Sequence, residues 1–352
     1  MRGKTIDPAN IGEILIRAVN WLGDAVMTTP AIGTVREFFP TARITLLATP
    51  LVAELFTPHP WVDELLVYDR NGRHRGIGGR LRLAAELNAR AFDLAIILPN
   101  SFDSALVPWL AGIPRRLGLR SDGRGMLLNY GMPKSLQSTT GHQSEAYRAI
   151  LAHFGITASA KPQLLATTSA EDGAIAELLR SGNINPDDVV VGINPGATYG
   201  SAKRWYPERF AAVADDLAGR WGAKIVITGG PDETGIAADI AATMTSPCLN
   251  LAGRTKVREL MAVIKRCTFF VTNDSGPMHI AAAFGVPLVA IFGSTDHTTT
   301  YPLAEHALVV CQQVDCAPCM KRECPTDHRC MTAVTPAMVV EAAEKLKTSS
   351  TF

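Results

Sequence analysis

Short apolar runs alternate with amphipathic stretches along the whole chain, a pattern that predicts repeated βα units with parallel sheets. Strands are expected at 14–16, 44–47 and 94–98 in the first half, and at 189–193, 224–228, 269–272 and 288–292 in the second. Polar residues 157–169 and a further break at 181–186 separate the two halves. We therefore predict an α/β protein with two Rossmann-like parallel-sheet domains that face each other across a cleft.

The domain limits follow from these breaks and from the last periodic segment. We predict a first domain at 1–170 and a second at 171–335. Helical periodicity runs from Pro336 to Lys347, with Thr335 as the expected N-cap. The final segment, 336–352, is expected to be a helix that packs back across the domains.

A polar turn follows the expected strand at 269–272 and precedes an Ala-rich helix. The turn and the first turn of that helix contain Asp274, Ser275, Gly276 and His279. Open α/β sheets bind ligands at the carboxyl ends of their strands, and a helix N-terminus there attracts phosphate. We interpret the turn as a phosphate site. An N-capping role for Asp274 or Ser275, and a structural role for a half-buried His279, are the alternatives.

A second turn of this kind follows the expected strand at 189–193. Its glycines allow a ligand to approach the backbone, and Thr198 offers a hydroxyl group. Lys203 and Arg204 lie just before a helix that begins at Pro207, where the helix dipole disfavours cations. Cations in that position indicate a bound anion, although a solvated basic turn is the alternative. A diphosphate held between the two turns would explain both.

In the first half, Asp24 follows Gly23 at the expected start of a helix, after the first strand. A carboxylate at the carboxyl end of that strand would face the predicted cleft and could accept a proton from a substrate hydroxyl. An N-capping aspartate is the alternative.

Composition excludes several classes of protein. Hydrophobic residues make up 47% of the 352 positions and charged residues 19%, as in a well-packed globular protein. A net charge of +1 argues against a nucleic-acid partner. The sequence contains neither a phosphate-loop motif nor a G-x-G-x-x-G turn after a strand. The absence of these motifs argues against a classical nicotinamide-dependent dehydrogenase. Because residues 1–10 contain no apolar leader and no apolar run approaches the length of a membrane span, we expect the protein in the cytoplasm.

Two groups of basic residues and one of cysteines need interpretation. The arginines at 70–82 and at 115–124 are either a solvated face or a surface that attracts an anionic acceptor or an anionic membrane. Five cysteines, from Cys311 to Cys330, include one C-x2-C pair but no second pair to complete a zinc site. Reduced thiols are therefore favoured over a metal site.

Several ordered motifs make the chain similar to the bacterial lipopolysaccharide heptosyltransferases of glycosyltransferase family 9 over nearly its full length. These motifs lie at 22–30, 98–106, 142–155, 194–210 and 272–293. The cysteine-containing segment 316–325 most resembles the type II members. The resemblance implies a GT-B fold in a cytoplasmic enzyme of a Gram-negative bacterium, with peripheral contact at the inner-membrane surface.

The resemblance also implies an activity: an inverting transfer of heptose from ADP-heptose to the heptose- and Kdo-bearing inner core of lipopolysaccharide, without a metal or cofactor. Asp24 matches the base, and Asn20, Ser101 and Arg115 are the expected acceptor residues. Asp103 stands where a basic acceptor contact is expected. The expected donor residues are Thr198, Tyr199, Lys203, Arg204, Glu233, Thr255, Asp274, Ser275, Gly276 and His279. For the ribose contact, Asp232 is an alternative to Glu233.

Two other functions are compatible with these motifs. A nucleotide-sugar epimerase of similar fold would need acid and base groups at the sugar carbon. A non-catalytic module would bind a nucleotide diphosphate without turnover.

Overall fold

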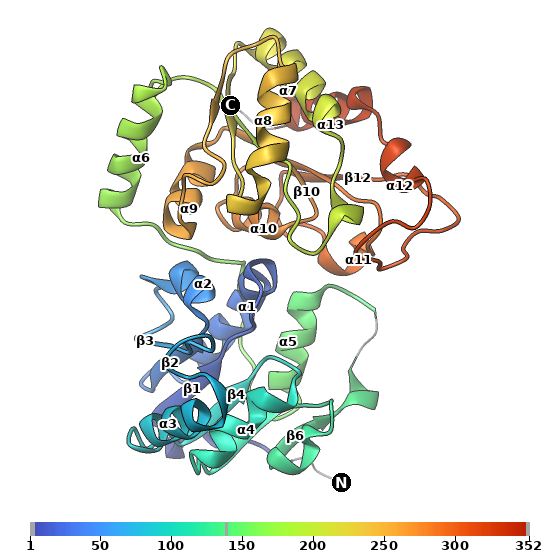
Figure 1. Ribbon diagram of the computed structural model, residues 1–352. Coiled ribbons are helices and arrows are strands. Elements are labelled where there is room, and N and C mark those ends of the chain that lie inside the picture. The colour runs from blue at the N-terminus through green and yellow to red at the C-terminus, as the bar shows by residue number, and fades with distance from the viewer. Residues whose placement is uncertain (1–3, 138–139, 350–352) are drawn as a thin grey trace. The chain divides into compact units, whose positions relative to one another are not determined.

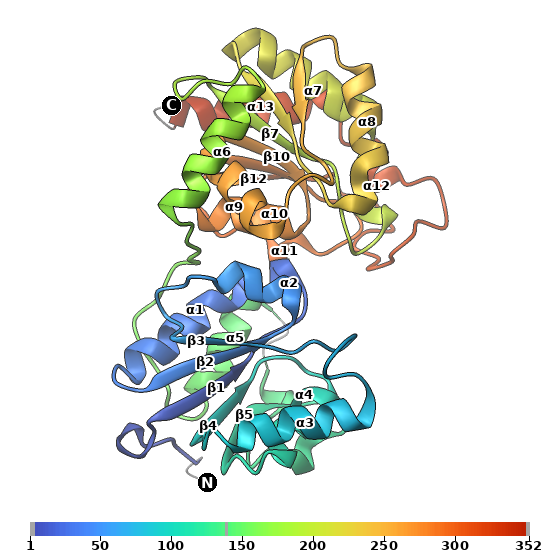
Figure 2. The same cartoon turned by 60° about the vertical axis from the view of Figure 1, so that its left-hand side comes forward.

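The structure, a computed structural model, describes residues 4–137 and 140–349. The chain divides into two compact units, Met1–Ala166 and Thr167–Phe352. In each unit, helices cover a parallel sheet (Figures 1 and 2). The predicted α/β class is confirmed, whereas the predicted facing arrangement of the domains stays a prediction.

The first unit contains a six-stranded parallel sheet in the order β3-β2-β1-β4-β5-β6. Its strands are β1 (Glu13–Arg17), β2 (Arg43–Ala48), β3 (Glu64–Val67), β4 (Leu94–Ile97), β5 (Arg115–Arg120) and β6 (Tyr130–Pro133). Its helices are α1 (Leu22–Phe38), α2 (Pro50–Ala53), α3 (Gly76–Asn88), α4 (Phe102–Leu110) and α5 (Gln143–Ala152).

The second unit repeats this topology in a six-stranded sheet ordered β12-β11-β10-β7-β8-β9. Its strands are β7 (Val190–Asn194), β8 (Lys224–Ile227), β9 (Cys248–Asn250), β10 (Phe269–Asn273), β11 (Leu288–Ile291) and β12 (Ala307–Val310). Its helices are α6 (Ser169–Ser181), α7 (Pro207–Trp221), α8 (Thr234–Thr243), α9 (Val257–Arg266), α10 (Gly276–Ala283), α11 (His297–Thr300), α12 (Arg329–Thr332) and α13 (Pro336–Ser349).

Both sheets have the Rossmann strand order, in which the direction of winding reverses between the first and fourth strands of the unit. The reversal falls between β1 and β4 in the first unit and between β7 and β10 in the second. Loops that leave the carboxyl ends of these strand pairs diverge, so a ligand can enter between them. The turns singled out in the sequence follow β7 and β10, at the switch point of the second sheet.

The strands predicted from apolar runs are all present, but five others were not predicted: β3, β5, β6, β9 and β12. Four of these are edge strands. Most residues of β3, β9 and β12 are only half-buried, so their sequences lack a continuous apolar run. Sequence periodicity therefore identified the middle of each sheet rather than its edges.

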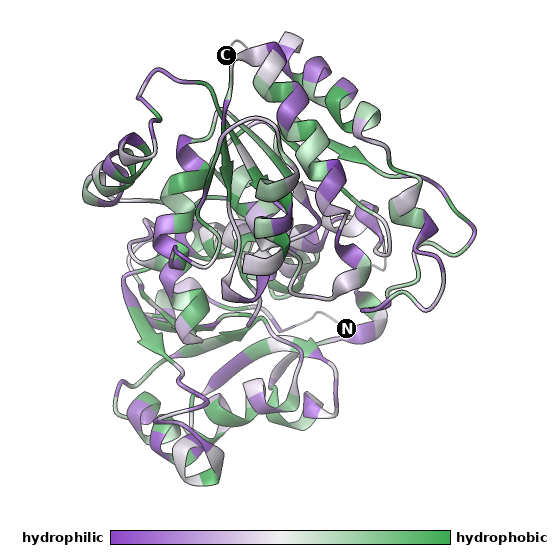
Figure 3. Ribbon diagram, turned by 45° about the horizontal axis from the view of Figure 1, so that its top comes forward, coloured by the Kyte–Doolittle hydropathy of each residue, from purple (hydrophilic) through white to green (hydrophobic). Residues whose placement is uncertain are grey.

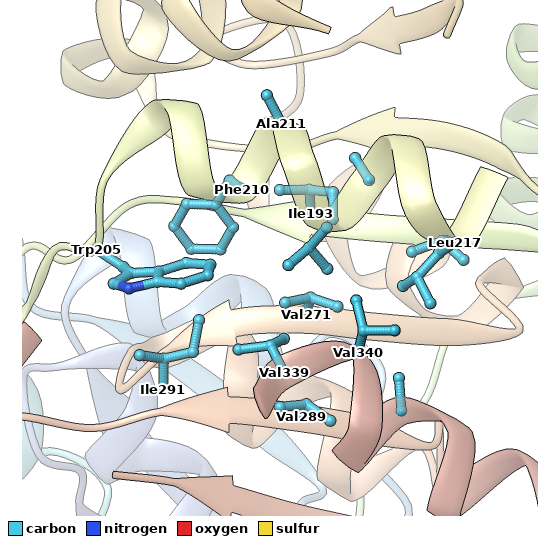
Figure 4. Close-up of a cluster of buried hydrophobic side chains, with 14 of the residues drawn as sticks. Ile193, Trp205, Phe210, Ala211, Leu217, Val271, Val289, Ile291, Val339 and Val340 are labelled. Atoms are coloured by element: carbon cyan, nitrogen blue, oxygen red, sulfur yellow. The ribbon is translucent and has the colours of Figure 1, made fainter. Parts of the chain in front are cut away.

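The core of the second unit lies between its sheet and the helices α7 and α13. Trp205, Phe210 and Leu217 pack there with side chains of β10 and β11 (Figure 4). Val339 and Val340 of α13 enter the same cluster, and α13 contacts α7, β11 and β12. These contacts account for the apolar face of α13, while its predicted crossing to the first domain stays a prediction. Most strands are coloured hydrophobic in Figure 3, while hydrophobic and hydrophilic residues alternate along the helices.

Helix α6 belongs to the second unit because charged contacts hold it against α9. Thr168 and Glu171 form a capping box at its start. Arg258 of α9 donates to both Glu171 carboxylate oxygens, at 2.7 and 2.5 Å, and Lys265 pairs with Asp172 at 2.8 Å. The units accordingly divide between 166 and 167, ahead of α6. Within the described ranges, no helix is long and apolar enough to cross a membrane.

Candidate functional site

Two asparagines hold the turns after β7 and β10 together. The Asn273 side chain donates to the Pro195 carbonyl at 2.7 Å and accepts from the Trp205 backbone N–H at 3.1 Å. Asn194 lies with its amide 3.5 Å from the Ser275 hydroxyl and accepts from Thr228 at 3.2 Å. Because both asparagines are almost fully buried, these bonds fix the two turns in one geometry.

An ion pair joins the cationic turn to the acidic one. Lys203 Nζ lies 2.5 Å from Asp274 Oδ2, and both side chains are mostly buried. Thr295, in the loop after β11, donates to the same carboxylate oxygen at 2.6 Å. The Asp274 side chain is therefore used in this network, while the N-cap position of α10 belongs to Ser275. Ser275 makes no side-chain capping bond; its hydroxyl lies 3.0 Å from that of Thr272.

Two close approaches of the backbone shape the turn after β7. A Cβ atom at Gly196 would lie 1.9 Å from Glu233 Oε1, and one at Gly200 would lie 2.1 Å from the Arg322 carbonyl oxygen. No other residue fits either position without movement. Glu233 accepts from the Gly230 N–H at 2.7 Å, which holds its carboxylate beside Gly196. Asp232 is exposed, so the structure brings Glu233 rather than Asp232 to this turn.

Aromatic residues anchor the same turn at both ends. Trp205 is fully buried, packs on Phe210 with ring centres 5.1 Å apart, and donates from Nε1 to the Val334 carbonyl at 3.1 Å. Tyr199 lies under Lys203 Nζ, which is 4.8 Å from the ring centre. Its hydroxyl donates to the Met320 carbonyl at 2.7 Å. Lys203 is thus held between a carboxylate and an aromatic ring.

The remaining expected donor residues lie along the carboxyl edge of the second sheet. Gly276 begins α10, and His279 lies buried on the same helix. Thr198 is exposed in the turn, whereas Arg204 is half-buried. Thr255 follows β9, two strands from the switch point. Among the described residues, neither Arg204 Nε nor Thr255 Oγ1 has a hydrogen-bond partner although both atoms are buried.

Two residues of this edge were missed by sequence reasoning. Thr295 contacts Asp274, and the hydroxyl of its buried neighbour Ser294 has no hydrogen-bond partner among the residues that the structure describes. Both follow β11, a strand that was predicted. Ligands bind at the carboxyl ends of strands in such sheets, so this rule, applied to the loop after β11, would have identified both residues.

In the first unit, three of the expected residues lie at the carboxyl edge of the sheet. Asp24 lies in the first turn of α1, whose N-cap position belongs to Trp21, so Asp24 is not an N-cap. Asn20 precedes that helix and accepts from Arg17 at 2.9 Å. Ser101, in the N-cap position of α4, makes no side-chain capping bond. Burial, and to a lesser extent the charge of Asp24, raise the pKa of Tyr147 on α5.

Arg115 is not brought to this edge. It begins β5 and pairs in register with Leu94, the first residue of β4, at the amino end of the sheet. Its guanidinium group donates to the Asp93 carbonyl at 3.4 Å. The structure therefore places Arg115 away from the edge that carries Asn20 and Ser101, and its expected contact with the acceptor stays a prediction. The basic residues at 115–124 occupy β5 and the loop after it.

Arg124 does not contribute to the surface of this group. Its side chain is fully buried, and burial lowers its pKa to about 10. It donates to the Leu119 carbonyl at 2.9 Å and to the Ser104 hydroxyl at 2.9 Å. The arginine serves to hold the loop after β5 against α4.

The first group of arginines does border a cavity. A hollow of about 340 Å³ lies at the carboxyl ends of β1, β2 and β3, and its lining includes Asn20, Tyr68, Arg70 and Arg80. Arg80 pairs with Asp103, which also accepts from the Tyr68 hydroxyl at 3.2 Å. Asp103 therefore neutralises one of the cations of this cavity.

The cysteines are all free thiols. Burial raises the pKa of Cys330, and the neighbouring Cys316, Cys324 and Cys319 raise it further. In the described part of the chain, no three His, Cys, Asp or Glu side chains are placed to hold a metal ion.

Fold and site together define an α/β protein with two Rossmann-type sheets, whose second unit brings Lys203, Asp274 and the first residues of α10 together at its switch point. The family model "Glycosyltransferase family 9 (heptosyltransferase)" matches residues 80–329. Lipopolysaccharide heptosyltransferase 2 of Salmonella typhimurium is 32% identical over 85% of this chain and 87% of its own length. The chain belongs to glycosyltransferase family 9, the heptosyltransferases, and is a glycosyltransferase.

Solved structures agree with this assignment. The Escherichia coli ADP-heptose LPS heptosyltransferase II matches with a TM-score of 0.82 and 29% identity, covering 95% of this chain and 98% of that one. A family 9 glycosyltransferase from Veillonella parvula matches with a TM-score of 0.88 and 27% identity, covering 99% and 100%. The resemblance stated from the motifs is thereby confirmed, and the epimerase and binding-module alternatives are not favoured.

Proposed function

We propose that this enzyme transfers heptose from ADP-heptose to the heptose- and Kdo-bearing inner core of lipopolysaccharide, as a heptosyltransferase of type II. The names and similarity of its relatives support the donor and the acceptor class. Among the structural observations, the Lys203–Asp274 pair next to the first residues of α10 gives the proposal its main support.

The donor diphosphate binds between the turns after β7 and β10. Backbone N–H groups at the start of α10 and the ammonium group of Lys203 contact its oxygens. Glu233, held beside Gly196, accepts from the ribose hydroxyls, and Thr255 lies further along the edge toward the adenine. When the sugar leaves, the extra negative charge on ADP is stabilised by Lys203, Arg204 and the α10 dipole.

The first unit binds the acceptor and supplies the base. Asn20 and Ser101 contact the acceptor sugar, and Asp24 takes the proton from the attacking hydroxyl. That hydroxyl oxygen forms the new bond to the anomeric carbon as the bond from that carbon to the diphosphate oxygen breaks. The electron pair leaves with ADP, and attack from the opposite face inverts the configuration. Protein cations and helix N–H groups suffice for the leaving charge, so no metal ion is required.

The acceptor class bears on where the enzyme works. A lipopolysaccharide precursor is anchored in a membrane, whereas the nucleotide sugar is water-soluble, so we propose that the enzyme works in the cytoplasm at the inner-membrane surface. Contact with that surface is peripheral, and nucleic acid is not a partner.

The test is incubation of the full chain with ADP-heptose, with and without truncated lipopolysaccharide whose inner core bears Kdo and heptose. We expect ADP release and a gain of one heptose in the acceptor mass only when both substrates are present. Conversion of the donor sugar without acceptor would indicate an epimerase. Tight ADP-heptose binding with no turnover on any core acceptor would indicate a binding module, and either result would refute the proposal.

A further inference from the structure

We infer that Arg322 is a further cation for the donor diphosphate, placed beside Lys203 by the segment that contains most of the C-terminal cysteines. We call residues 194–206, the turn after β7, the donor turn. The inference rests on the proposed function and adds to it a residue outside the turns after β7 and β10. We call residues 311–328, between β12 and α12, the cysteine segment; it contains no helix or strand. Irregular connections of this length are uncommon and are usually functional.

Backbone hydrogen bonds hold the cysteine segment on the donor turn. The Arg322 carbonyl accepts from the Ala202 N–H at 3.0 Å, one residue before Lys203. Gly200 has no side chain, and this absence lets the Arg322 carbonyl approach, since a Cβ there would lie 2.1 Å away. His328 closes the other end, with Nε2 lying 3.0 Å from the Ala202 carbonyl oxygen. Arg322 therefore has a defined position beside Lys203.

A second set of bonds fixes the segment just ahead of Arg322. The N–H groups of Cys319 and Met320 both donate to the Ser294 carbonyl, at 3.1 and 2.8 Å. The Tyr199 hydroxyl donates to the Met320 carbonyl at 2.7 Å. The segment is thus tied to the loops after β7 and β11, which border the predicted diphosphate site on both sides.

Arg322 and Lys203 share one aromatic ring. The Arg322 guanidinium carbon lies 5.3 Å from the centre of the Tyr199 ring, and Lys203 Nζ lies 4.8 Å from it. Stacking on a ring restrains a long, exposed side chain without neutralising its charge. Two cations are therefore placed around Tyr199, for which the family resemblance implies contact with the donor.

The charge balance of the site explains why a cation besides Lys203 and Arg204 is needed. Asp274 forms an ion pair with Lys203, which offsets much of the positive charge that Lys203 offers a diphosphate. Arg322 is exposed, and in the described ranges its guanidinium group has no carboxylate partner, only the Tyr199 ring. Its charge is thus available, and its planar group can donate two parallel bonds to phosphate oxygens.

Calorimetric titration of the full chain with ADP tests this inference. Arg322→Ala should weaken ADP binding roughly tenfold or more, and AMP binding less, because AMP lacks the second phosphate. Arg322→Lys should restore part of the affinity for ADP, and the dependence of ADP affinity on salt should be shallower in Arg322→Ala than in the parent.

Lys321→Ala is the matched control, since Lys321 is the exposed preceding residue and its loss removes the same charge. It should bind ADP as the parent does, and thermal unfolding should be the same for both variants. ADP affinity within twofold of the parent in Arg322→Ala, or an equal loss in Lys321→Ala, would overturn the inference alone. If the parent itself did not bind ADP, the proposed donor would fall and the inference with it.

Discussion

The two units share one strand order, yet they hold the loops at their switch points in different ways. In the second unit, Asn194 and Asn273 cross-link the turns after β7 and β10, and Lys203 pairs with Asp274. In the first unit, Asn20 in the loop after β1 accepts from the nearby Arg17, whereas the loop after β4 is bound by the loop after β5, where the Ser121 hydroxyl donates to the Asn100 carbonyl at 3.0 Å. The framework is common to both, and the difference lies in the loops.

This difference matches the two kinds of substrate in the proposed reaction. A nucleotide diphosphate has a constant shape, so a fixed constellation of donors and cations can be built for it before it binds. The hollow of about 340 Å³ in the first unit is lined by side chains from several loops, which suits a larger and more varied acceptor. We therefore assign diphosphate binding to the second unit and proton transfer to the first, and the variants below separate these roles.

The largest effect is expected from Asp24→Asn. Removing a general base typically lowers the rate by about a hundredfold to ten-thousandfold. Because Asp24 is in the first unit, the affinity for ADP should not change. Steady-state transfer assays measure the loss, and near-normal turnover in Asp24→Asn would eliminate Asp24 as the base.

A smaller loss is expected from Lys203→Ala, which removes a charge-assisted contact worth roughly 1.5–3 kcal/mol. This corresponds to about a tenfold to hundredfold decrease in kcat/KM, part of it in kcat because charge grows on the departing diphosphate. Arg204→Ala should cost less, and Lys203→Arg should rescue only partly. Equal losses in the two alanine variants would mean that the turn contributes general positive charge rather than a placed ammonium group.

The assignment of α6 to the second unit predicts a pH-dependent effect on stability. The bond from Arg258 lowers the Glu171 pKa from 4.5 to about 2. Above pH 4.5 Glu171 is ionised in both the folded and the unfolded state, so the full stabilisation is present; it is lost as the pH falls toward 2. Glu171→Gln should lower the free energy of unfolding by about 1 kcal/mol at pH 7.

Urea unfolding of the parent and Glu171→Gln across this range provides the measurement. The difference between the two proteins should shrink as the pH drops from 4.5 toward 2. A difference that is independent of pH would show that the Arg258 contact contributes through shape alone.

The smallest expected effect is that of chelators. Because protein cations and helix N–H groups are proposed to stabilise ADP, EDTA should leave the transfer rate unchanged. Strong inhibition by EDTA, reversed by Mg²⁺ or Zn²⁺, would contradict this account of the second unit. It would also favour a metal site at the cysteines.

Sequence patterns were sufficient to locate elements whose own residues are apolar or mark a helix start. Pro207 correctly marked the start of α7, and the apolar runs located β7 and β10 with the turns that follow them. They failed where polar residues lie in strands. Arg115, Arg116 and Arg120 belong to β5, whose backbone pairs with β4 and β6 and needs no apolar run.

Contacts between distant segments were not accessible from one sequence. The pairing of Lys203 with Asp274 and the docking of Arg322 on the donor turn depend on how loops from several strands meet at the sheet edge. The choice of Glu233 over Asp232 likewise needed the geometry, because only the structure shows Glu233 against Gly196. Motifs indicated which residues to consider, and packing decided which of them meet.

ADP titration of two variants in parallel, Asp24→Asn and Lys203→Ala, tests the division of roles most directly. The account predicts that Asp24→Asn binds ADP with the affinity of the parent chain, while Lys203→Ala binds it at least about tenfold more weakly. Unchanged ADP affinity in Lys203→Ala, or an equal loss in Asp24→Asn, would contradict the assignment of the diphosphate to the second unit.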